Sequence, residues 1–273
     1  MFGGYSCTYQ IKIDPTRSPV VHPPRKIPFT QRERIKEELD RLEKLGVIRK
    51  AEETTEWVSS LVVVEKPNGK VRLCLDPRDL NRAIQREHYP MQALEEAAAE
   101  LSDSKVFSVL DATSWFSHIK LDEKSSELLT FNTPFGRYQY LRMPFGINSV
   151  PEIFQKRMTQ AFDDLSGVRT IADDILIWGR NNAEHNHRLE QVLERSRKVG
   201  LKLNRSKMKI MTPEVPYIGH VLKSHGLKPD PSKVRAVEEM PTPADKPALL
   251  RFLGMLNCMS KFIPNLANLT QQL

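Results

Sequence analysis

The chain has 273 residues, of which 40% are hydrophobic and 27% charged. This balance excludes a disordered chain and supports a substantial buried core, in one large or two small domains. Lysine and arginine number 41 against 34 acidic residues, which gives a formal charge of +7. The excess permits a polyanionic partner without requiring one, because a merely basic soluble enzyme has the same balance.

Three cysteines, Cys7, Cys74 and Cys258, lie far apart and lack C-x-x-C spacing. A zinc site or disulfide framework is therefore not expected, and a reducing compartment fits better. No apolar run approaches the length that spans a bilayer, and the first residues lack the basic and apolar regions of a secretory signal. We expect a soluble, cytoplasmic protein with no membrane partner.

The first 29 residues carry five prolines and few apolar repeats, which predicts an extended arm or linker. Thr30 and Glu33 then have capping-box spacing at the start of a predicted helix. Apolar residues continue at helical spacing to Leu45, and Gly46 supplies the stop.

A β-branched run over residues 57–65 predicts a strand, and Asn68-Gly69 after it is a strong hairpin signal. The return strand, residues 71–76, alternates apolar and polar side chains. Three cations lie at or near the hairpin tip: Lys66, Lys70 and Arg72. They form a basic finger for an anionic ligand, or they only keep a strand edge soluble, and the pattern leaves both roles open.

Residues 94–101 have a helical pattern, and Val106–Leu110 is then a buried strand that ends at Asp111. A carboxylate at the end of a buried strand is a common arrangement for an active site on a sheet. Asp111 is therefore the first candidate for catalysis.

A second hairpin is predicted around Pro134-Phe135-Gly136. After it, Ser149 and Glu152 again have capping-box spacing, with a proline between them in the first turn. The helix that they open has one apolar face, which continues to Leu165.

Asp173 and Asp174 lie inside an otherwise apolar run from Ile171 to Gly179. Two adjacent like charges are costly to bury, so packing does not explain them. We expect them at the tip of a tight hairpin, where a cation could neutralise them. A solvated Asp-Asp turn is the alternative, because aspartate is a common turn residue.

A further helix is predicted over residues 183–199, ended by Gly200. His185 and His187 lie on it, but residues two apart on a helix do not face each other and cannot easily share one metal ion. We expect both histidines on the solvated face. The remaining predicted elements are strands at 201–203 and 217–222 and helices at 232–239 and 244–262.

The order of elements between residues 106 and 203 is that of a split β-α-β arrangement. Such a sheet could bring Asp111 beside Asp173 and Asp174 on adjacent central strands. Three carboxylates on one sheet edge are ligands of the type that magnesium prefers. Two such ions, roughly 3.5–4 Å apart, can activate a hydroxyl and stabilise the leaving oxygen in phosphoryl transfer. The residues alone therefore lead to two-metal nucleotide chemistry.

The stretch from Trp57 to Leu222 resembles a reverse transcriptase of the Ty3/gypsy class of long-terminal-repeat retroelements. The motifs that carry the resemblance appear in family order: Lys66–Arg72, Leu75–Asn81, Phe107–Asp111, Tyr138–Gly146, Phe154-Gln155, Ala172–Ile175, Gly200–Asn204 and Tyr217-Ile218-Gly219. Each motif alone is weak, but their joint order over more than half of the chain is specific.

The resemblance implies an α+β fold of the right-hand polymerase type, with fingers, a ferredoxin-like palm and a partial thumb. Residues 1–29 would be an extended linker that follows a protease region, and 30–222 would hold the fingers and palm. Within that part, the fingers would span about 30–90 and 122–148, and the palm about 91–121 and 149–222. Residues 223–273 would be the partial thumb.

The resemblance also implies a role for each matching residue. The metal-binding, catalytic carboxylates would be Asp111, Asp173 and Asp174. Lys207 would protonate the leaving pyrophosphate. The incoming nucleotide would be bound by Lys66, Arg72, the backbone of Ala112 and the aromatic gate Phe116.

Nucleic acid would meet two further groups of residues. The primer grip would be Tyr217, Ile218 and Gly219. The first thumb helix would contact the template–primer through Arg251, Gly254 and Asn257.

A member of this family would need two Mg²⁺ ions, with Mn²⁺ as the other candidate, and its partners would be a primed RNA or DNA template and a dNTP. Other Pol domains would accompany it in the parent polyprotein, and an intact element would place it in a cytoplasmic virus-like particle. The alternative is a truncated or co-opted fragment that binds nucleic acid without polymerising. The retained carboxylates favour the enzyme, whereas Trp115, where the family usually has a small residue, favours the fragment.

Overall fold

The computed structural model describes residues 8–65, 69, 71–90, 100–101, 103–113, 115–217, 219–224 and 226–271, and only the backbone of Trp115. Several predictions lie outside the described residues: those on Lys66, Asn68, Lys70, Ile218 and most of the predicted helix at 94–101.

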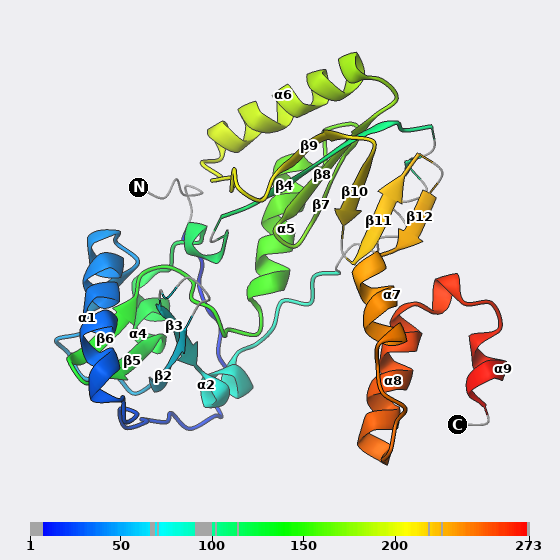
Figure 1. Ribbon diagram of the computed structural model, residues 1–273. Coiled ribbons are helices and arrows are strands. Elements are labelled where there is room, and N and C mark those ends of the chain that lie inside the picture. Colours follow the sequence, from blue (N-terminus) through cyan, green and yellow to red (C-terminus); the bar gives the residue numbers. More distant parts are fainter. Residues whose placement is uncertain are drawn as a thin grey trace.

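The first half of the chain builds a five-stranded sheet in the order β1-β6-β5-β2-β3 (Figure 1). Its strands are β1 (Ile48–Lys50), β2 (Val58–Glu65), β3 (Val71–Asp76), β5 (Thr130–Thr133) and β6 (Gly136–Tyr140). The helices of this part are α1 (Phe29–Lys44), α2 (Arg78–Ala83) and α4 (Glu123–Leu128). Both predicted hairpins, β2–β3 and β5–β6, are confirmed as antiparallel pairs, and β3 buries alternate residues as predicted.

The two predicted capping boxes are wrong. The N-cap of helix α1 is Pro28, two residues before the predicted Thr30, so Thr30 falls inside the first turn. No side chain of the described chain caps the helix. Ser149 is the N-cap of α5 (Val150–Phe162), but its backbone is already helical (φ −87°, ψ −7°), and within the described residues its hydroxyl makes no capping bond. Glu152 pairs instead with Arg86, at 2.7 Å.

The second half of the chain builds a four-stranded antiparallel sheet in the order β7-β8-β4-β9. Its strands are β4 (Val106–Asp111), β7 (Val168–Ile171), β8 (Asp174–Gly179) and β9 (Lys209–Thr212). Helices α5 and α6 (Asn182–Lys198) contact each other and pack on this sheet, as Figure 1 shows. The predicted split β-α-β arrangement is confirmed.

Residue alternation divides the four-stranded sheet into two faces. Leu110, Ile175 and Ile177 belong to the large core that the helices cover and that continues into the five-stranded part. Phe107 and Leu176 belong to a second, smaller core. Because alternate residues of a strand face opposite sides, Asp111 and Asp174 lie on the side away from the helices.

The predicted solvated face of α6 is right for His187 and wrong for His185. His187 is exposed, whereas His185 is fully buried. Helix α6 approaches β8 closely at this residue because Gly179 has no side chain: a Cβ there would lie 2.7 Å from the backbone nitrogen of His185.

A small three-stranded sheet follows, made of β10 (Glu214–Tyr217), β11 (His220–Lys223) and β12 (Gly226–Pro229). The predicted single strand at 217–222 is wrong, because Gly219 (φ +71°) turns the chain and Tyr217 pairs with His220. The predicted strand at 201–203 is also wrong, since within the described chain it forms only an isolated bridge from Leu203 to Ala112.

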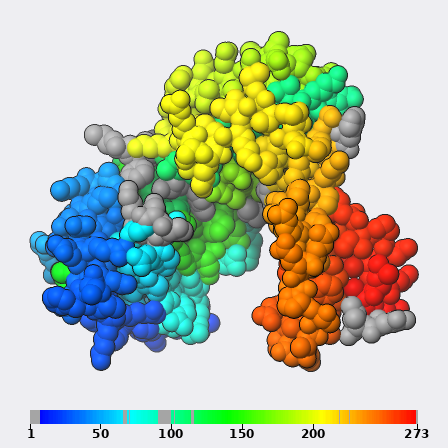
Figure 2. Space-filling model, viewed as in Figure 1, coloured from blue at the N-terminus to red at the C-terminus, as the bar shows by residue number. Residues whose placement is uncertain are grey.

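The C-terminal elements are α7 (Pro231–Glu238), α8 (Lys246–Cys258), the 3-10 helix η2 (Ser260–Phe262) and α9 (Leu266–Thr270). They confirm the two predicted helices, with a break after Cys258. Figure 2 shows an open hollow between the five-stranded part (blue to cyan) and the column of α7 and α8 (orange). Among the described residues, no helix is both long and apolar enough to cross a membrane.

The arm over residues 8–28, all of which are described, contains no helix and no strand of more than one residue. It lies against the rest of the chain through isolated bridges from Tyr9 to Leu121, Ile13 to Ile84 and Val21 to Val58.

Candidate active site

Asp111 and Asp174 form the last register pair of β4 and β8. Directly opposed residues of an antiparallel pair share one face, with Cβ atoms about 4.5–5.5 Å apart. Asp173 precedes Asp174 in the two-residue turn that joins β7 to β8, where Ile171 pairs with Asp174. The predicted Asp-Asp hairpin is therefore confirmed, and three carboxylates gather at one end of the sheet.

The turn is strained, and a buried glutamine on helix α5 stabilises it. Ala172 has a positive φ (+52°), which costs an alanine about 1–2 kcal/mol. Gln155 of α5 is fully buried, and its Oε1 accepts the Ala172 N–H at 2.9 Å. Its Nε2 donates to the carbonyl of Thr170 at 2.7 Å. These bonds hold the end of β7 and the first residue of the turn, and they fix the hairpin that carries Asp173 and Asp174.

The hairpin tip is also tied to the end of β4. The Ala112 N–H donates to the Asp173 carbonyl at 2.8 Å. The resemblance implies that the Ala112 backbone faces the triphosphate, but its N–H already has this intramolecular partner. Ala112 therefore locks β4 to the turn.

Lys207 reaches the carboxylates from the loop before β9. The loop is fixed because the Asn204 N–H donates to the Asp111 carbonyl at 2.8 Å and the Lys207 N–H donates to the Asn204 carbonyl at 3.1 Å. The Lys207 Nζ then lies 2.9 Å from Asp111 Oδ2. This charge-assisted bond raises the pKa of Lys207 above its ordinary value, so the side chain stays an ammonium at neutral pH.

The crowding of carboxylates perturbs Asp174. Burial, and then the charges of Asp173 and Asp111, raise its pKa to about 6, while Lys207 opposes the shift. A divalent cation would relieve this repulsion, and the oxygen donors are of the type that magnesium accepts. Among the described side chains, however, no three His, Cys, Asp or Glu already converge as a metal site. The donor set fits a metal provided that Asp111 turns from the Lys207 ammonium toward the ion.

A cavity of about 510 Å³ opens beside the carboxylates, between the two large sheets. Six of the predicted site residues line it: Arg72, Asp111, Ala112, Phe116, Asp173 and Lys207. The predicted nucleotide-binding and catalytic groups are thus brought together, with Arg72 contributed by β3 and the carboxylates by β4 and the β7–β8 turn.

Phe145 lines the same cavity and was not among the predicted site residues. Its ring centroid lies 3.6 Å from that of Phe116, and the Arg72 guanidinium carbon lies 5.0 Å from it. Phe145 therefore connects the predicted gate to the predicted phosphate clamp. The sequence shows a tight Met-Pro-Phe-Gly loop here, but no local pattern indicates which side chains the ring meets.

The loop that carries Phe145 is fastened to α2. Gly146 has φ +104°, and a Cβ there would lie 2.7 Å from the Leu75 carbonyl. The Asn81 amide donates to the Gly146 carbonyl at 2.8 Å, and the Asn148 N–H donates to Asn81 Oδ1 at 3.0 Å. Only glycine fits this close approach.

The described residues of the predicted primer grip and thumb do not line this cavity, although burial and then the charge of Asp174 raise the pKa of Tyr217, which lies near the catalytic hairpin. The Tyr217 side chain is 1% exposed and belongs to the small core under the four-stranded sheet, so it faces inward. The Lys233 side chain of α7 lies over Gly219. On α8 the three predicted residues, Arg251, Gly254 and Asn257, are exposed at a spacing of three, on one side of the helix.

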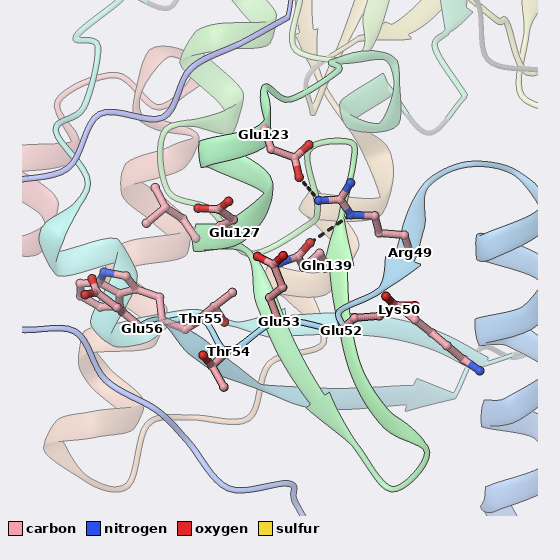
Figure 3. Close-up of a pocket in the computed structure, with 12 residues that line it drawn as sticks. Arg49, Lys50, Glu52, Glu53, Thr54, Thr55, Glu56, Glu123, Glu127 and Gln139 are labelled. Atoms are coloured by element: carbon pink, nitrogen blue, oxygen red, sulfur yellow. Dashed lines mark hydrogen bonds and ion pairs between the residues drawn. The ribbon is translucent and has the colours of Figure 1, made fainter.

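A second, larger cavity of about 590 Å³ lies on the five-stranded part, around the segment between β1 and β2 (Figure 3). Its charged lining residues are Arg49, Lys50, Glu52, Glu53, Glu56, Glu123 and Glu127. Arg49 is already paired with Glu123, and its Nε donates to Gln139 at 3.0 Å. Because the remaining charge is acidic, this cavity would repel a triphosphate or a nucleic-acid backbone.

The sequence pattern described as "Reverse transcriptase (RNA-dependent DNA polymerase)" matches residues 64–222, more than half of the chain. The chain belongs to the reverse transcriptase family. The matched range holds all the cavity-lining site residues, from Arg72 to Lys207. Divalent-metal dependence is general in reverse transcriptases, which agrees with the chemistry of the carboxylates.

Relatives of this reverse transcriptase chain are retroelement polyproteins. It is 31% identical over 265 residues to the retrovirus-related Pol polyprotein from transposon opus of Drosophila melanogaster, covering 94% of this chain and 26% of that protein. It is 28% identical over 249 residues to the transposon Tf2-3 polyprotein of Schizosaccharomyces pombe, covering 90% of this chain and 18% of that protein. The predicted Ty3/gypsy-type retrotransposon resemblance is confirmed, and the chain spans about a quarter or less of these relatives.

Solved structures share the fold. A foamy viral protease–reverse transcriptase in complex with double-stranded DNA superposes with a TM-score of 0.90 at 21% identity, covering 100% of this chain and 48% of that one. The foamy viral enzyme in complex with an RNA/DNA hybrid gives a TM-score of 0.81 at 21% identity, covering 94% and 34%. The predicted α+β right-hand polymerase fold is confirmed.

Proposed function

We propose that this chain is the polymerase part of a retrotransposon Pol polyprotein and catalyses RNA-directed DNA synthesis. The reaction would join a dNTP to the primer 3′-hydroxyl and release pyrophosphate. The observation that carries the proposal is the opposition of Asp111 and Asp174, with Asp173 beside them. Asp111 and Asp173 line a cavity that Arg72 and Lys207 also line.

The carboxylates would hold the catalytic metal. Two Mg²⁺ ions, with Mn²⁺ as the alternative ion, would be bound by Asp111, Asp173 and Asp174 and would supply activation of the primer hydroxyl and neutralisation of the leaving oxygens. The chain itself supplies the alignment, because Gln155 and Ala112 fix the turn on which two of these carboxylates lie.

The nucleotide would occupy the cavity between the two large sheets. Arg72 suits a triphosphate because its planar guanidinium can donate two parallel hydrogen bonds to phosphate oxygens. Phe145 supports that guanidinium, and Phe116 contacts Phe145, so the two rings would form an aromatic wall beside the sugar that disfavours a 2′-hydroxyl. Lys66 would add a second cation.

Lys207 would act as the proton donor. Its ammonium lines the nucleotide cavity and its pKa is raised, so it carries a proton at the pH at which the leaving pyrophosphate needs one.

A primed RNA or DNA template would lie in the hollow between the five-stranded part and α8 (Figure 2). The exposed residues Arg251, Gly254 and Asn257 would face its backbone, and the turn at Gly219 would hold the primer. We propose the fingers at about 30–90 and 122–148, the palm at about 91–121 and 149–222, the thumb at 223–273 and the linker at 1–29. The parent polyprotein would act in a cytoplasmic virus-like particle with its other Pol domains.

Primer extension tests the proposal. The chain is incubated with a DNA primer on an RNA template, dNTPs and Mg²⁺, and compared with Asp173→Ala, which should abolish the product. The proposal fails if the intact chain binds template–primer but adds no nucleotide.

The second candidate function is nucleic-acid binding without synthesis. It is supported by the Lys207 ammonium on Asp111, which occupies one of the three carboxylates, and by Trp115 at the start of η1 (Trp115–His118), beside the gate. Extension that appears only in Trp115→Gly would favour this reading for the natural chain and would locate the obstacle at the nucleotide cavity.

A further inference from the structure

The position of Lys207 depends on β9, which begins two residues after it. β9 is the last strand of the described four-stranded sheet, it has four residues, and the first three are exposed. Burial therefore does little to fix its register. A slip by one residue would move the strand by about 3.4 Å and reverse the face of every side chain, so Lys207 would no longer meet Asp111.

A bulge marks the middle of the β4–β9 pairing. Phe107 pairs with Thr212 and Val109 with Lys209, so Ser108 lies opposite two residues, Ile210 and Met211. Met211 has φ +55°, a conformation that costs a residue with a side chain about 1–2 kcal/mol. A compensating contact is needed to keep the bulge at this position.

Two buried side chains supply that contact. The Met211 N–H donates to Ser108 Oγ at 2.9 Å, and Ser108 Oγ lies 2.8 Å from His185 Nε2. Ser108 and His185 are both 0% exposed. The chain of contacts runs from helix α6 through the central strand β4 to the strained residue of β9.

The direction of the bond between Ser108 and His185 depends on the tautomer of the ring. Nδ1 of His185 lies 3.4 Å from Asn186 Oδ1, an acceptor, which favours the tautomer with its proton on Nδ1. Nε2 then accepts from the Ser108 O–H, while Ser108 Oγ accepts from the Met211 N–H. Burial lowers the pKa of His185, which keeps the imidazole neutral and Nε2 able to accept.

We propose that His185 and Ser108 are positioning residues that fix the bulge of β9 and thereby hold Lys207 on Asp111. Ser108 and Asp111 lie three residues apart on β4 and face opposite sides of the sheet, so the pair acts on the catalytic side from the helix side. The inference rests on the proposed function only for the role of Lys207 in the reaction.

Kinetics give the first test. In single-nucleotide incorporation, Ser108→Ala and His185→Leu should lower the maximal rate by roughly tenfold, as expected when a proton donor is displaced, with little change in dNTP or template–primer affinity. His185→Gln keeps an acceptor at a similar reach and should restore most of the rate. Two matched controls should incorporate at the wild-type rate: Ser196→Ala, another buried serine, and His187→Leu, the exposed neighbour.

A double-mutant cycle separates positioning from general loss of stability. In a Lys207→Ala background, His185→Leu should cause no further loss of rate, because the residue through which it acts is gone. An equal loss in both backgrounds would overturn the proposal.

Amide hydrogen exchange of the metal-free chain decides the structural part without any need for activity. The Met211 amide should be protected in the wild type and in His185→Gln, and should exchange much faster in Ser108→Ala and His185→Leu. Unchanged protection in Ser108→Ala would overturn the inference even if the enzyme is active. If the wild type extends no primer, the proposed function fails while the exchange result still decides whether this pair fixes β9.

Discussion

Asp111 and Asp174 lie directly opposite each other at the end of β4 and β8, with Asp173 in the adjoining turn. Like charges at such positions destabilise a sheet, and burial, followed by the charges of Asp173 and Asp111, raises the pKa of Asp174 to about 6. Electrostatic repulsion therefore destabilises the four-stranded sheet at the carboxylates that are expected to bind metal. Lys207 offsets part of that cost through its bond to Asp111.

The raised pKa of Asp174 predicts how the stability of the metal-free chain depends on pH. Between the ordinary aspartate pKa of 3.8 and about 6, the folded chain binds more protons than the unfolded chain. The free energy of unfolding therefore falls as pH rises through this window, and the penalty is fully present above about pH 6. Asp174→Asn should be more stable than the wild type at pH 7–8 and equal to it below pH 4.

Denaturant unfolding in a chelating buffer from pH 4 to pH 8 measures this difference. Glu190→Gln, which removes an exposed carboxylate of α6, is the matched control and should not change the pH dependence. A lower stability of Asp174→Asn at pH 7–8 would contradict the repulsion argument.

Gln155 predicts a separate effect on the catalytic hairpin. Gln155→Leu keeps the volume but leaves the Ala172 N–H and the Thr170 carbonyl without their buried partner. Each group left unpaired should cost about 1–3 kcal/mol, and nucleotide incorporation should fall because the turn loses its fixed position. Gln160→Leu, at an exposed position of the same helix, is the control. Urea unfolding with incorporation assays measures both effects, and wild-type stability in Gln155→Leu would refute the role.

Much of the palm could be predicted from sequence because its strands have strong local signals. Val106–Asp111 and the apolar run around Asp173 and Asp174 are short, apolar and bounded by polar turns, and their carboxylates have no packing explanation. The order of motifs in the family resemblance then indicated which distant strands lie together. The Asp-Asp pair alone could not indicate this, because such a pair is also typical of a solvated turn.

The rest depends on contacts that no local pattern encodes. Gln155 reaches the turn only because α5 packs on β7. Phe145 meets Arg72 only because the loop after β6 packs against β3. His185 was placed on the wrong face because helical spacing says which residues share a side, not that Gly179 lets the backbone of α6 approach β8 closely at His185. The capping boxes failed because the φ and ψ angles decide which residue is the N-cap and whether its side chain can cap, and the sequence pattern does not give these angles.

Phe145 predicts an effect on nucleotide binding. Phe145→Ala removes the ring on which the Arg72 guanidinium rests, and a cation–π contact of this kind is worth about 0.5–2 kcal/mol. The dissociation constant for dNTP should rise roughly three- to tenfold, with a smaller effect on the maximal rate. Single-turnover incorporation over a range of dNTP concentrations separates the two quantities. Phe145→Tyr keeps the ring and should bind dNTP like the wild type, so a weakened Phe145→Tyr would show that Arg72 does not depend on the ring.

Arg251 predicts how α8 takes part in binding nucleic acid. Its exposed guanidinium is on the side of α8 that also presents Gly254 and Asn257, and a contact with one backbone phosphate of a duplex contributes about −0.9 to the slope of log affinity against log salt. Arg251→Ala should weaken template–primer binding at low salt and reduce the magnitude of that slope by roughly one. Lys50→Ala is the control, because Lys50 is equally cationic and exposed but lines the acidic cavity of the five-stranded part. Fluorescence anisotropy of a labelled duplex over a salt series measures both slopes. An unchanged slope for Arg251→Ala, or an equal change of slope for Lys50→Ala, would contradict the prediction. Nucleic acid would then not lie along this side of α8, and the positive charge of the chain would act without a defined contact there.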